Sequence, residues 1–235
     1  MISVCIASYN GEKYIEEQLL SILCQLDVKD EIIVSDDSST DNTLDKVKGL
    51  HDDRIKLFPR NKFHSPIFNF ENALKKANGD IIFLCDQDDI WLPNKVNVMV
   101  EQLNKCDLVV SDCKVVDGNL NILQDSFFSS LNSGPGFCKN LIKNTYLGCC
   151  MAFRRDILDY VLPFPRHIAM HDIWIGLSVE LHGCVSFINQ PLMLYRRHGN
   201  NVSFGGEKSY FSLWYRIKYR LEMLYYLLRR NYLNS

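Results

Sequence analysis

Three carboxylates crowd into four positions of the stretch DIIFLCDQDDIWLPNK, which covers residues 80–95. Asp86, Asp88 and Asp89 follow the unbroken apolar run at residues 81–85, which predicts a strand buried on both faces. Like charges this close repel one another unless a cation or solvent compensates them. Open α/β sheets bind ligands at the carboxyl ends of their strands. The stretch therefore suits a hard divalent cation and, through that cation, the phosphates of a ligand.

A purely structural role for these carboxylates is the alternative. Asp88 and Asp89 lie shortly before Pro93, a residue that favours the first turn of a helix. Acidic side chains stabilise that end of a helix because they face its partial positive charge. Helix capping accounts for one carboxylate well and for three poorly, so we favour the cation site.

Polar and aromatic residues also follow the first two predicted strands. The apolar run at residues 2–7 leads into the turn SYNG at residues 8–11, where Tyr9 can either stack on a nucleotide base or close the sheet edge. The strand EIIVS ends at Asp36 and Asp37, which capping of the next helix does not explain. We expect one of these two carboxylates to accept a hydrogen bond from a base N–H or a ribose hydroxyl.

Two further candidates come late in the chain. Asp172 stands at the start of an apolar helical pattern, where capping of the helix would be a sufficient role for it. His198 comes immediately after a predicted strand, in the turn HGNN. A histidine in such a turn can face a ligand, although an isolated loop histidine is ordinarily just solvated.

Strands and helices alternate from residue 2 to residue 111, which predicts an α/β fold with a mainly parallel sheet flanked by helices. The first turn has one glycine in place of GxGxxG, so it does not match a dinucleotide-binding Rossmann site. Residues 112–140 are rich in turn signals and predict a hairpin and a mobile loop, which either shapes a second-substrate site or only connects elements. Later strands are predicted at residues 145–154, 184–189 and 192–196.

The tail over residues 208–230 combines an apolar stripe at helical spacing with interspersed basic residues. The stripe is Trp214, Ile217, Leu221, Leu224 and Leu228, and the basic residues are Arg216, Lys218, Arg220, Arg229 and Arg230. A basic amphipathic helix is typical of binding to a membrane surface or to a partner. Packing back onto the same domain is the alternative.

Composition argues against several classes of protein. The 235 residues carry a net charge of −2, which gives no electrostatic reason to expect a nucleic-acid partner. The nine cysteines show no CxxC spacing, and an odd number without a framework favours a reducing compartment. The strand pattern from residue 2 leaves no room for a signal peptide, and no apolar run reaches membrane-spanning length. We therefore expect a cytoplasmic catalytic part.

With these pieces in place, the chain closely resembles the family 2 glycosyltransferases of the GT-A fold, in particular their bacterial rhamnosyltransferase-like branch. The matching segments are SVCIASYNGEKYIEEQLLSIL, IIVSDDSSTDNT, GDIIFLCDQDDIWLPNKV, GCCMAFRRDIL, HDIWIG and YRRHGNNVS. Their order and spacing over residues 2–203 make the match specific. The resemblance implies a GT-A glycosyltransferase domain over residues 1–203 and a basic amphipathic helical extension over residues 204–235.

The resemblance also implies roles on the donor side. Tyr9 and Asp37 match the residues that hold the nucleotide base. Asp86 and Asp88 match the acidic DxD-type motif that binds the ribose and a Mg²⁺ or Mn²⁺ ion on the donor diphosphate. His198 matches the later histidine that closes over the metal and the diphosphate. Two further residues of the nucleotide site stand beside Tyr9, namely Ser8 and Asn10.

On the acceptor side, Asp172 matches the catalytic base. Gly148 resembles part of the acceptor wall, and Trp91 resembles a support for the metal loop. The chain departs from many relatives at His171, where they carry glutamate before the base. The catalytic base Asp172 is retained, but the resemblance does not indicate how His171 would orient an acceptor.

The implied reaction is a single in-line displacement that inverts the anomeric centre. One general base is enough for it, and the sequence offers no obvious pair of carboxylates for a double displacement. The implied donor is dTDP-rhamnose or a UDP-sugar. The implied acceptor is a glycan or lipid-linked hydroxyl in bacterial surface-polysaccharide synthesis (capsule, O-antigen or cell wall). The tail would then hold the enzyme on the inner face of the cell membrane.

Two competing functions remain at this stage. A sugar-phosphate nucleotidyltransferase would need a glycine-rich, basic phosphate loop after the first strand, and SYNGEK supplies little of that. A nucleotide-binding scaffold protein on a degenerate glycosyltransferase frame predicts the loss of Asp88, Asp172 or His198. All three residues are present.

Overall fold

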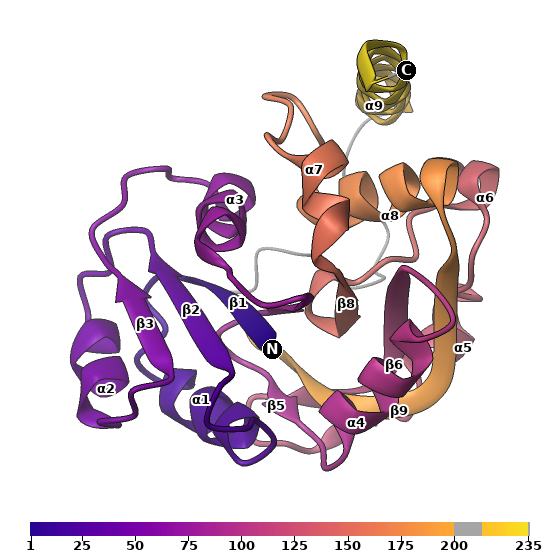
Figure 1. The fold of residues 1–235 in the computed structure, drawn as a ribbon. Coiled ribbons are helices and arrows are strands. Elements are labelled where there is room, and N and C mark those ends of the chain that lie inside the picture. The colour runs from indigo at the N-terminus through magenta and orange to yellow at the C-terminus, as the bar shows by residue number, and fades with distance from the viewer. Residues whose placement is uncertain (200–212, 235) are drawn as a thin grey trace.

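The computed structural model describes residues 1–199 and 213–234, and over these residues one curled sheet forms the centre of the fold (Figure 1). Its nine strands are β1 (Ile2–Ser8), β2 (Glu31–Asp36), β3 (Ile55–Phe58), β4 (Ile81–Cys85), β5 (Ile90–Trp91), β6 (Leu108–Asp117), β7 (Ile122–Gln124), β8 (Met151–Arg154) and β9 (Val185–Arg197). They are ordered β3-β2-β1-β4-β8-β6-β9-β5, and β7 pairs with β6.

Helices lie between the strands in the chain and flank the sheet, except for the C-terminal helix, which follows the last strand. They are α1 (Ile15–Leu23), α2 (Thr43–Gly49), α3 (Pro66–Lys76), α4 (Lys95–Leu103), α5 (Phe127–Leu131), α6 (Phe137–Ile142), α7 (Leu158–Val161), α8 (His171–His182) and α9 (Leu213–Asn234). Two single 3₁₀ turns, η1 (Gly148–Cys150) and η2 (Arg155–Ile157), flank β8.

The first four strands form a parallel half-sheet. β1 pairs with β2 and with β4, and β2 pairs with β3, all in parallel. β1, β2 and β4 are largely buried because α1 and α2 lie on one face of the half-sheet and α3 lies on the other (Figure 1). Parallel pairing brings the carboxyl ends of β1, β2 and β4 to one edge, so the acidic residues that follow these strands meet there.

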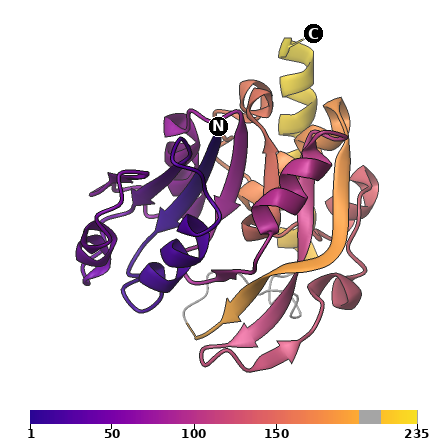
Figure 2. The same cartoon turned by 60° about the horizontal axis from the view of Figure 1, so that its bottom comes forward.

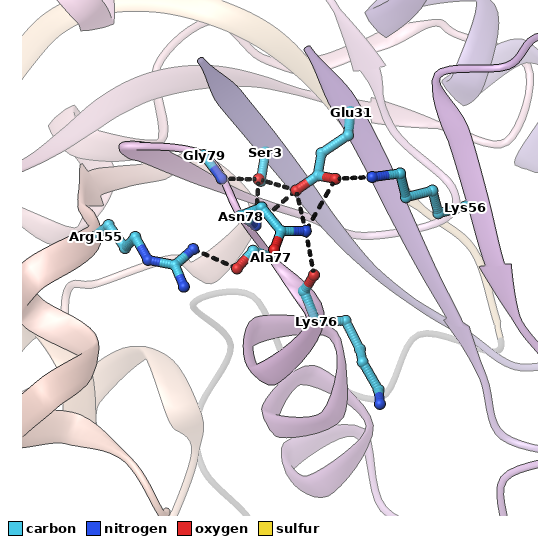
Figure 3. Close-up of polar contacts among 8 residues, drawn as sticks. All are labelled: Ser3, Glu31, Lys56, Lys76, Ala77, Asn78, Gly79 and Arg155. Carbon is cyan, nitrogen blue, oxygen red and sulfur yellow. Dashed lines mark hydrogen bonds and ion pairs between the residues drawn. The ribbon is translucent and has the colours of Figure 1, made fainter. Parts of the chain in front are cut away.

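A polar cluster around the buried carboxylate of Glu31 closes the opposite edge of this half-sheet (Figure 3). The Glu31 carboxylate accepts hydrogen bonds from Ser3 Oγ (2.6 Å) and the Asn78 N–H (2.6 Å), and it pairs with Lys56 (2.5 Å). A Cβ at Gly79 would lie 2.6 Å from the backbone nitrogen of Ser3, so only glycine lets the chain pass here. The groups at this edge bond to one another, which indicates a structural role.

Beyond β4 the sheet is mixed. β8 runs antiparallel to both β4 and β6, while β9 runs parallel to β6 (Figure 2). The two strands predicted at residues 184–189 and 192–196 are one strand, β9. Pro191 has no N–H to give to the ladder, and the register with β6 shifts there while the strand continues.

Residues 112–140 contain more regular structure than their turn signals predict. β6 continues into this segment, and β7 returns beside it as the expected hairpin. The helices α5 and α6 stand where a mobile loop was expected. Asp112 anchors α5 because its carboxylate accepts hydrogen bonds from Ser126 Oγ (2.6 Å) and the Phe128 N–H (3.0 Å). Phe127 and Phe128 are buried, so these aromatic rings belong to the core.

The C-terminal helix α9 contacts the rest of the chain along one face. Met223 and Leu227 are buried there. Arg220 donates to the carbonyl of Leu141 (2.9 Å), and Arg230 donates to the carbonyl of Pro163 (2.7 Å). Packing onto the same domain is therefore right for this face, and it occupies two of the five basic side chains of the tail.

The apolar stripe of α9 is left largely uncovered by the described residues. Trp214, Leu221 and Leu228 are 76%, 61% and 59% exposed, Ile217 is exposed, and Leu224 is partly buried. Within the described segments, no helix combines the length and the apolar character that crossing a membrane requires. The predicted domain boundary between residues 203 and 204 lies outside the described residues.

Candidate active site

A cavity of about 870 Å³ opens at the carboxyl edge of the parallel half-sheet. Its walls come from the turn after β1, the ends of β2 and β4, the start of α3, η1, the start of α8 and the residues after β9. The predicted site residues that line it are Ser8, Tyr9, Asn10, Asp37, Asp86, Asp88, Gly148, His171, Asp172 and His198. The fold thus brings together side chains that are up to 190 residues apart in sequence (198 minus 8).

Trp91 is the predicted site residue that does not line this cavity. Its side chain is buried, its ring lies 5.3 Å from that of Phe83, and the ammonium of Lys95 lies 5.1 Å from its centroid. Trp91 belongs to β5, which pairs with β9 shortly before that strand reaches His198. This position is compatible with a supporting role under the acidic loop.

The turn after β1 forms the mouth of the cavity. Tyr9 is 56% exposed, and its backbone N–H and carbonyl both bond to the side-chain amide of Gln87 at 2.9 Å. Asn10 adopts a left-handed backbone (φ 49°), and its side-chain oxygen accepts a hydrogen bond from the Thr40 N–H (2.9 Å). Within the described part of the chain, the hydrogen bonds of Tyr9 involve only its backbone, and its exposed ring offers a face for stacking.

The two carboxylates after β2 have different surroundings. Asp36 is fully buried and accepts a hydrogen bond from Ser8 Oγ (2.9 Å), so both residues stabilise the turn. Asp37 lines the cavity and accepts hydrogen bonds from the N–H groups of Phe63 (2.6 Å) and Ser65 (3.1 Å). Asp37 therefore also fixes the segment that leads into α3.

The acidic loop after β4 meets the residues after β9. Asp88 Oδ2 lies 2.7 Å from His198 Nε2, and the His198 ring stacks on Tyr14 at 5.0 Å. Burial, and then the charge of Asp88, raise the pKa of Asp86 to about 7. The raised pKa means that the ionised form of Asp86 is disfavoured here, and a bound cation would stabilise that form.

Asp88 and His198 fit a divalent cation. A carboxylate oxygen beside an imidazole nitrogen suits Mn²⁺, and Mg²⁺ accepts the carboxylate together with phosphate oxygens and water. A second group, Asp86, Asp89 and Cys149, has ligand atoms within 4.8 Å of one another. Burial raises the pKa of the Cys149 thiol, which stays protonated and suits a hard cation poorly. The donor set thus favours Asp88 and His198.

Asp89 and Arg196 join the acidic loop to the end of β9. Asp89 Oδ1 accepts a hydrogen bond from the Arg196 N–H (2.9 Å). The Arg196 guanidinium donates to the carbonyl of Asp88 (2.8 Å) and to Glu17 (2.6 Å), and it lies 4.5 Å from the centre of the Tyr14 ring. Neither Asp88 nor Asp89 caps α4, which begins at Lys95 and has Asn94 at its N-cap position. The capping alternative for this cluster is therefore wrong.

Asp172 lies in the first turn of α8 but does not cap it. The N-cap position is Met170, and Asp172 Oδ1 accepts a hydrogen bond from the adjacent Ile173 N–H (2.6 Å). Burial raises the pKa of Asp172 to about 6, although hydrogen bonds from Ile173, Asn144 and Gly148 act in the opposite direction. A carboxylate that titrates just below neutral pH is suited to take up a proton.

Three residues of the site were not singled out from sequence. Tyr14 lies directly before α1, and Phe70 is a buried residue of α3. Arg196 ended a predicted strand, although it stands within the segment YRRHGNNVS. Because this segment is one of those that carry the family resemblance, it could have pointed to Arg196. Nothing in the neighbouring sequence distinguishes Phe70 from an ordinary core residue.

The model of glycosyl transferase family 2 matches residues 3–162. The chain belongs to this family. The glycosyltransferase is 34% identical to the dTDP-rhamnosyl transferase RfbG of Shigella flexneri over 215 residues, which cover 83% of the chain and 72% of RfbG. It is 30% identical to the UDP-Glc:alpha-D-GlcNAc-diphosphoundecaprenol beta-1,3-glucosyltransferase WfgD of Escherichia coli, with 80% of the chain and 73% of WfgD covered.

Solved structures confirm the GT-A fold. The S. aureus TarS 1–349 structure in complex with UDP-GlcNAc superposes with a TM-score of 0.72 at 21% sequence identity, and the match covers 94% of this chain and 66% of the TarS 1–349 chain. At this identity the likeness shows the fold alone. The chain spans 72% of RfbG and 73% of WfgD, but 36% of the longer TarS chain that has also been solved.

Proposed function

We propose that the protein is an inverting, metal-dependent glycosyltransferase that moves a sugar from a nucleotide-sugar donor to a hydroxyl of a glycan or lipid-linked acceptor. One observation carries the proposal: a single cavity holds a carboxylate with a pKa of about 6, Asp172, and the Asp88–His198 pair. The first group can take a proton from an acceptor, and the pair can hold the cation of a donor diphosphate.

The donor would lie along the edge formed by β1, β2 and β4. Tyr9 offers an exposed ring to the base, and Asp37 and Asp86 offer carboxylates to the base and the ribose. Asp88 and His198 would hold Mg²⁺ or Mn²⁺, which as a Lewis acid supplies charge neutralisation on the leaving diphosphate. Asn10 and Ser8 would act indirectly, because they hold the turn that carries Tyr9.

The acceptor would approach from the side of α8 and η1. Asp172 takes the proton of the attacking hydroxyl, whose oxygen forms the new bond to the anomeric carbon as the bond to the diphosphate breaks. General-base catalysis of this kind contributes roughly 10²–10⁴-fold in rate. The other carboxylates of the cavity serve the nucleotide and the cation in this scheme. With no carboxylate left as a nucleophile, a single displacement inverts the anomeric centre.

The donor sugar is proposed from the relatives. RfbG is a dTDP-rhamnosyl transferase and is 34% identical to this chain, so dTDP-rhamnose is the first donor to test. UDP-sugars come next, because WfgD is named for UDP-Glc and TarS is solved with UDP-GlcNAc. The diphosphoundecaprenol in the name of WfgD supports a lipid-linked acceptor. Together these relatives favour a role in bacterial surface-polysaccharide synthesis.

The test is hydrolysis of a panel of nucleotide sugars, with water as the acceptor. We expect the pure protein to release nucleoside diphosphate from dTDP-rhamnose or a UDP-sugar in the presence of Mn²⁺, and EDTA to abolish the release. Asp172→Asn should lose activity, whereas Asp125→Asn, at a carboxylate that is 82% exposed, should retain it. A protein that binds nucleotide without turnover would be a scaffold, and one that forms nucleotide sugars from sugar phosphates would be a nucleotidyltransferase.

We also propose that α9 rests on an anionic membrane surface through its exposed stripe. Trp214, Leu221 and Leu228 are largely exposed, and burying such a side chain stabilises binding by roughly 1.5–3 kcal/mol. Exposed Lys218 and Arg229 supply positive charge, each worth about 1 kcal/mol near anionic lipid. Because Arg220 and Arg230 bond to the body, the apolar contribution should outweigh the electrostatic one.

Sedimentation with lipid vesicles tests the membrane contact. The protein should pellet with vesicles that contain phosphatidylglycerol, less with neutral ones, and only moderately less in high salt. Leu221→Glu should release it, whereas Leu123→Glu, at an equally exposed leucine of β7, should not. Equal recovery of the wild type and Leu221→Glu would reject the contact, and a change of oligomeric state in Leu221→Glu would favour a second copy of the chain.

A further inference from the structure

His171 is a buried imidazole whose two ring nitrogens have no hydrogen-bond partner among residues 1–199 and 213–234. The residue is 4% exposed, and it begins α8 directly before Asp172. A buried polar atom without a partner has lost its bonds to water and gained none in the fold. One such atom in a native protein calls for an explanation, and here one ring carries two. No residue of these two ranges supplies the partner, and we look for it in a ligand bound in the cavity.

The ring is held in place although its nitrogens are unpaired. Phe70 of α3 stacks on it, with 4.2 Å between the ring centroids and an angle of 30° between the planes. Gly148 of η1 lies against Nε2, since a Cβ added to this glycine would be 2.7 Å from that nitrogen. His171 lines the same cavity as Gly148 and Asp172. A fixed ring at the wall of a cavity suits recognition of a ligand.

The chemistry of the missing partner follows from the charge state of the ring. Burial lowers the pKa of His171 to about 3, so the imidazole is neutral at physiological pH. A neutral imidazole has one N–H donor and one acceptor nitrogen. A phosphate or carboxylate would instead favour the charged ring, and it would add negative charge beside Asp172. A hydroxyl group both donates and accepts, and a sugar carries several of them on adjacent carbons.

We propose that His171 hydrogen-bonds a neutral hydroxyl group of the sugar that lies beside Asp172, and that it thereby determines which sugar is accepted there. The inference rests on the proposed function, because that function supplies the sugars. Both the donor sugar and the acceptor sugar present such hydroxyls next to the reacting carbon or oxygen. A hydroxyl of the donor sugar and a hydroxyl of the acceptor sugar would bond to the ring in the same way. Kinetic assays of hydrolysis and of transfer distinguish the two sugars.

Three variants test this role. His171→Phe keeps an aromatic ring stacked on Phe70 and removes both nitrogens. His171→Gln returns an amide donor and acceptor near the position of Nε2. His182→Phe is the matched control, because this histidine is exposed at the other end of α8 and its ring lies 4.7 Å from that of Tyr160. Thermal unfolding of each variant checks that the fold is intact.

Two assays separate the donor from the acceptor. The first measures kcat and KM for hydrolysis of the nucleotide sugar that the wild type cleaves, with Mn²⁺ and with water as the acceptor. The second measures transfer from this donor to p-nitrophenyl glycosides of glucose, N-acetylglucosamine, galactose and rhamnose. We expect His171→Phe to lower kcat/KM about tenfold or more in one of the two assays. A tenfold decrease corresponds to about 1.4 kcal/mol, which is the size expected for the loss of one hydrogen bond. His171→Gln should recover part of the loss, and His182→Phe should match the wild type.

A higher donor KM in hydrolysis assigns the hydroxyl to the donor sugar, and a loss confined to transfer assigns it to the acceptor. Unchanged kinetics of His171→Phe in both assays would overturn the inference. Equal losses in His171→Phe and His171→Gln would also overturn it, because they would mean that only the packing of the ring matters. A wild-type protein without hydrolysis or transfer would instead refute the proposed function, and this inference with it.

Discussion

Replacing Asp172 with asparagine should stabilise the fold while it removes catalysis. Burial raises the pKa of this carboxyl from 3.8 to about 6, so the folded chain holds its proton more tightly than the unfolded chain does. As the pH rises from about 4 to about 6, the unfolded chain loses the proton first, and stability falls. Above pH 6 the penalty is complete, at about 3 kcal/mol for a difference of this size. Below pH 4 both states are protonated and the penalty disappears.

Asparagine removes the charge but keeps most of the shape, so it should recover part of this penalty. The hydrogen bond from the Ile173 N–H (2.6 Å) can be kept by the amide oxygen. The second carboxylate oxygen becomes an NH₂ group, which can no longer accept a hydrogen bond. We therefore expect a net gain of about 1–3 kcal/mol at pH 8. For a chain of this length, each kcal/mol raises Tm by about 2–4 °C.

The assay is thermal unfolding of the wild type and Asp172→Asn at pH 8 and at pH 4, beside donor hydrolysis at pH 8. The variant should melt higher than the wild type at pH 8, melt like it at pH 4, and hydrolyse at least 10²-fold more slowly. Asp125→Asn, at a largely exposed carboxylate, should change neither quantity. If Asp172→Asn melts lower than the wild type at pH 8, the ionised carboxylate stabilises the fold, and its assignment as a buried base with a raised pKa is wrong.

Four further outcomes are expected. Wild-type kcat/KM should fall about tenfold per pH unit below about pH 6, because protonated Asp172 cannot act as a base; a flat profile down to pH 5 would contradict this. Asp88→Asn should abolish the increase in UDP or dTDP affinity on adding Mn²⁺, as measured by calorimetry. Gly148→Ala should push against His171 and lower kcat/KM, whereas Gly49→Ala, with no atom within 4 Å of the new Cβ, should have no effect. Burial raises the pKa of Glu31 less than its hydrogen bonds lower it, so the pKa lies below its ordinary value of 4.5. Glu31→Gln should therefore lose about 1–3 kcal/mol of stability at neutral pH, and this difference should shrink as the pH falls below that ordinary value.

The acidic edge of the sheet was predictable because its signals are local. A buried strand is recognised from five consecutive apolar residues, and the carboxylates directly after it must lie at the strand's end. Parallel pairing then brings Asp37 and Asp86 to one edge, which follows from the alternation of strands and helices. No contact between distant residues had to be guessed for this part of the site.

Other features depend on contacts that no local pattern reveals. Phe127 and Phe128 fall in the segment predicted as a mobile loop, but Asp112 anchors the turn before them and both rings of α5 are buried. The Arg196–Glu17 ion pair joins residues 179 positions apart. In α9 the face that carries Met223 and Leu227 packs on the rest of the chain, and the predicted stripe is left exposed. Both faces repeat with the helical period, so residue spacing alone cannot tell which of them is buried.

The helix α3 links the two sides of the proposed site. At its start, Asp37 accepts a hydrogen bond from the Ser65 N–H, and Asn69 donates to the carbonyl of Ser8 (3.1 Å). One residue later, Phe70 stacks on His171 at the start of α8. The edge that would hold the nucleotide and the ring that would hold a sugar are thus fixed by adjacent residues of one helix. A displacement of α3 on nucleotide binding would therefore reach His171 through a single aromatic contact.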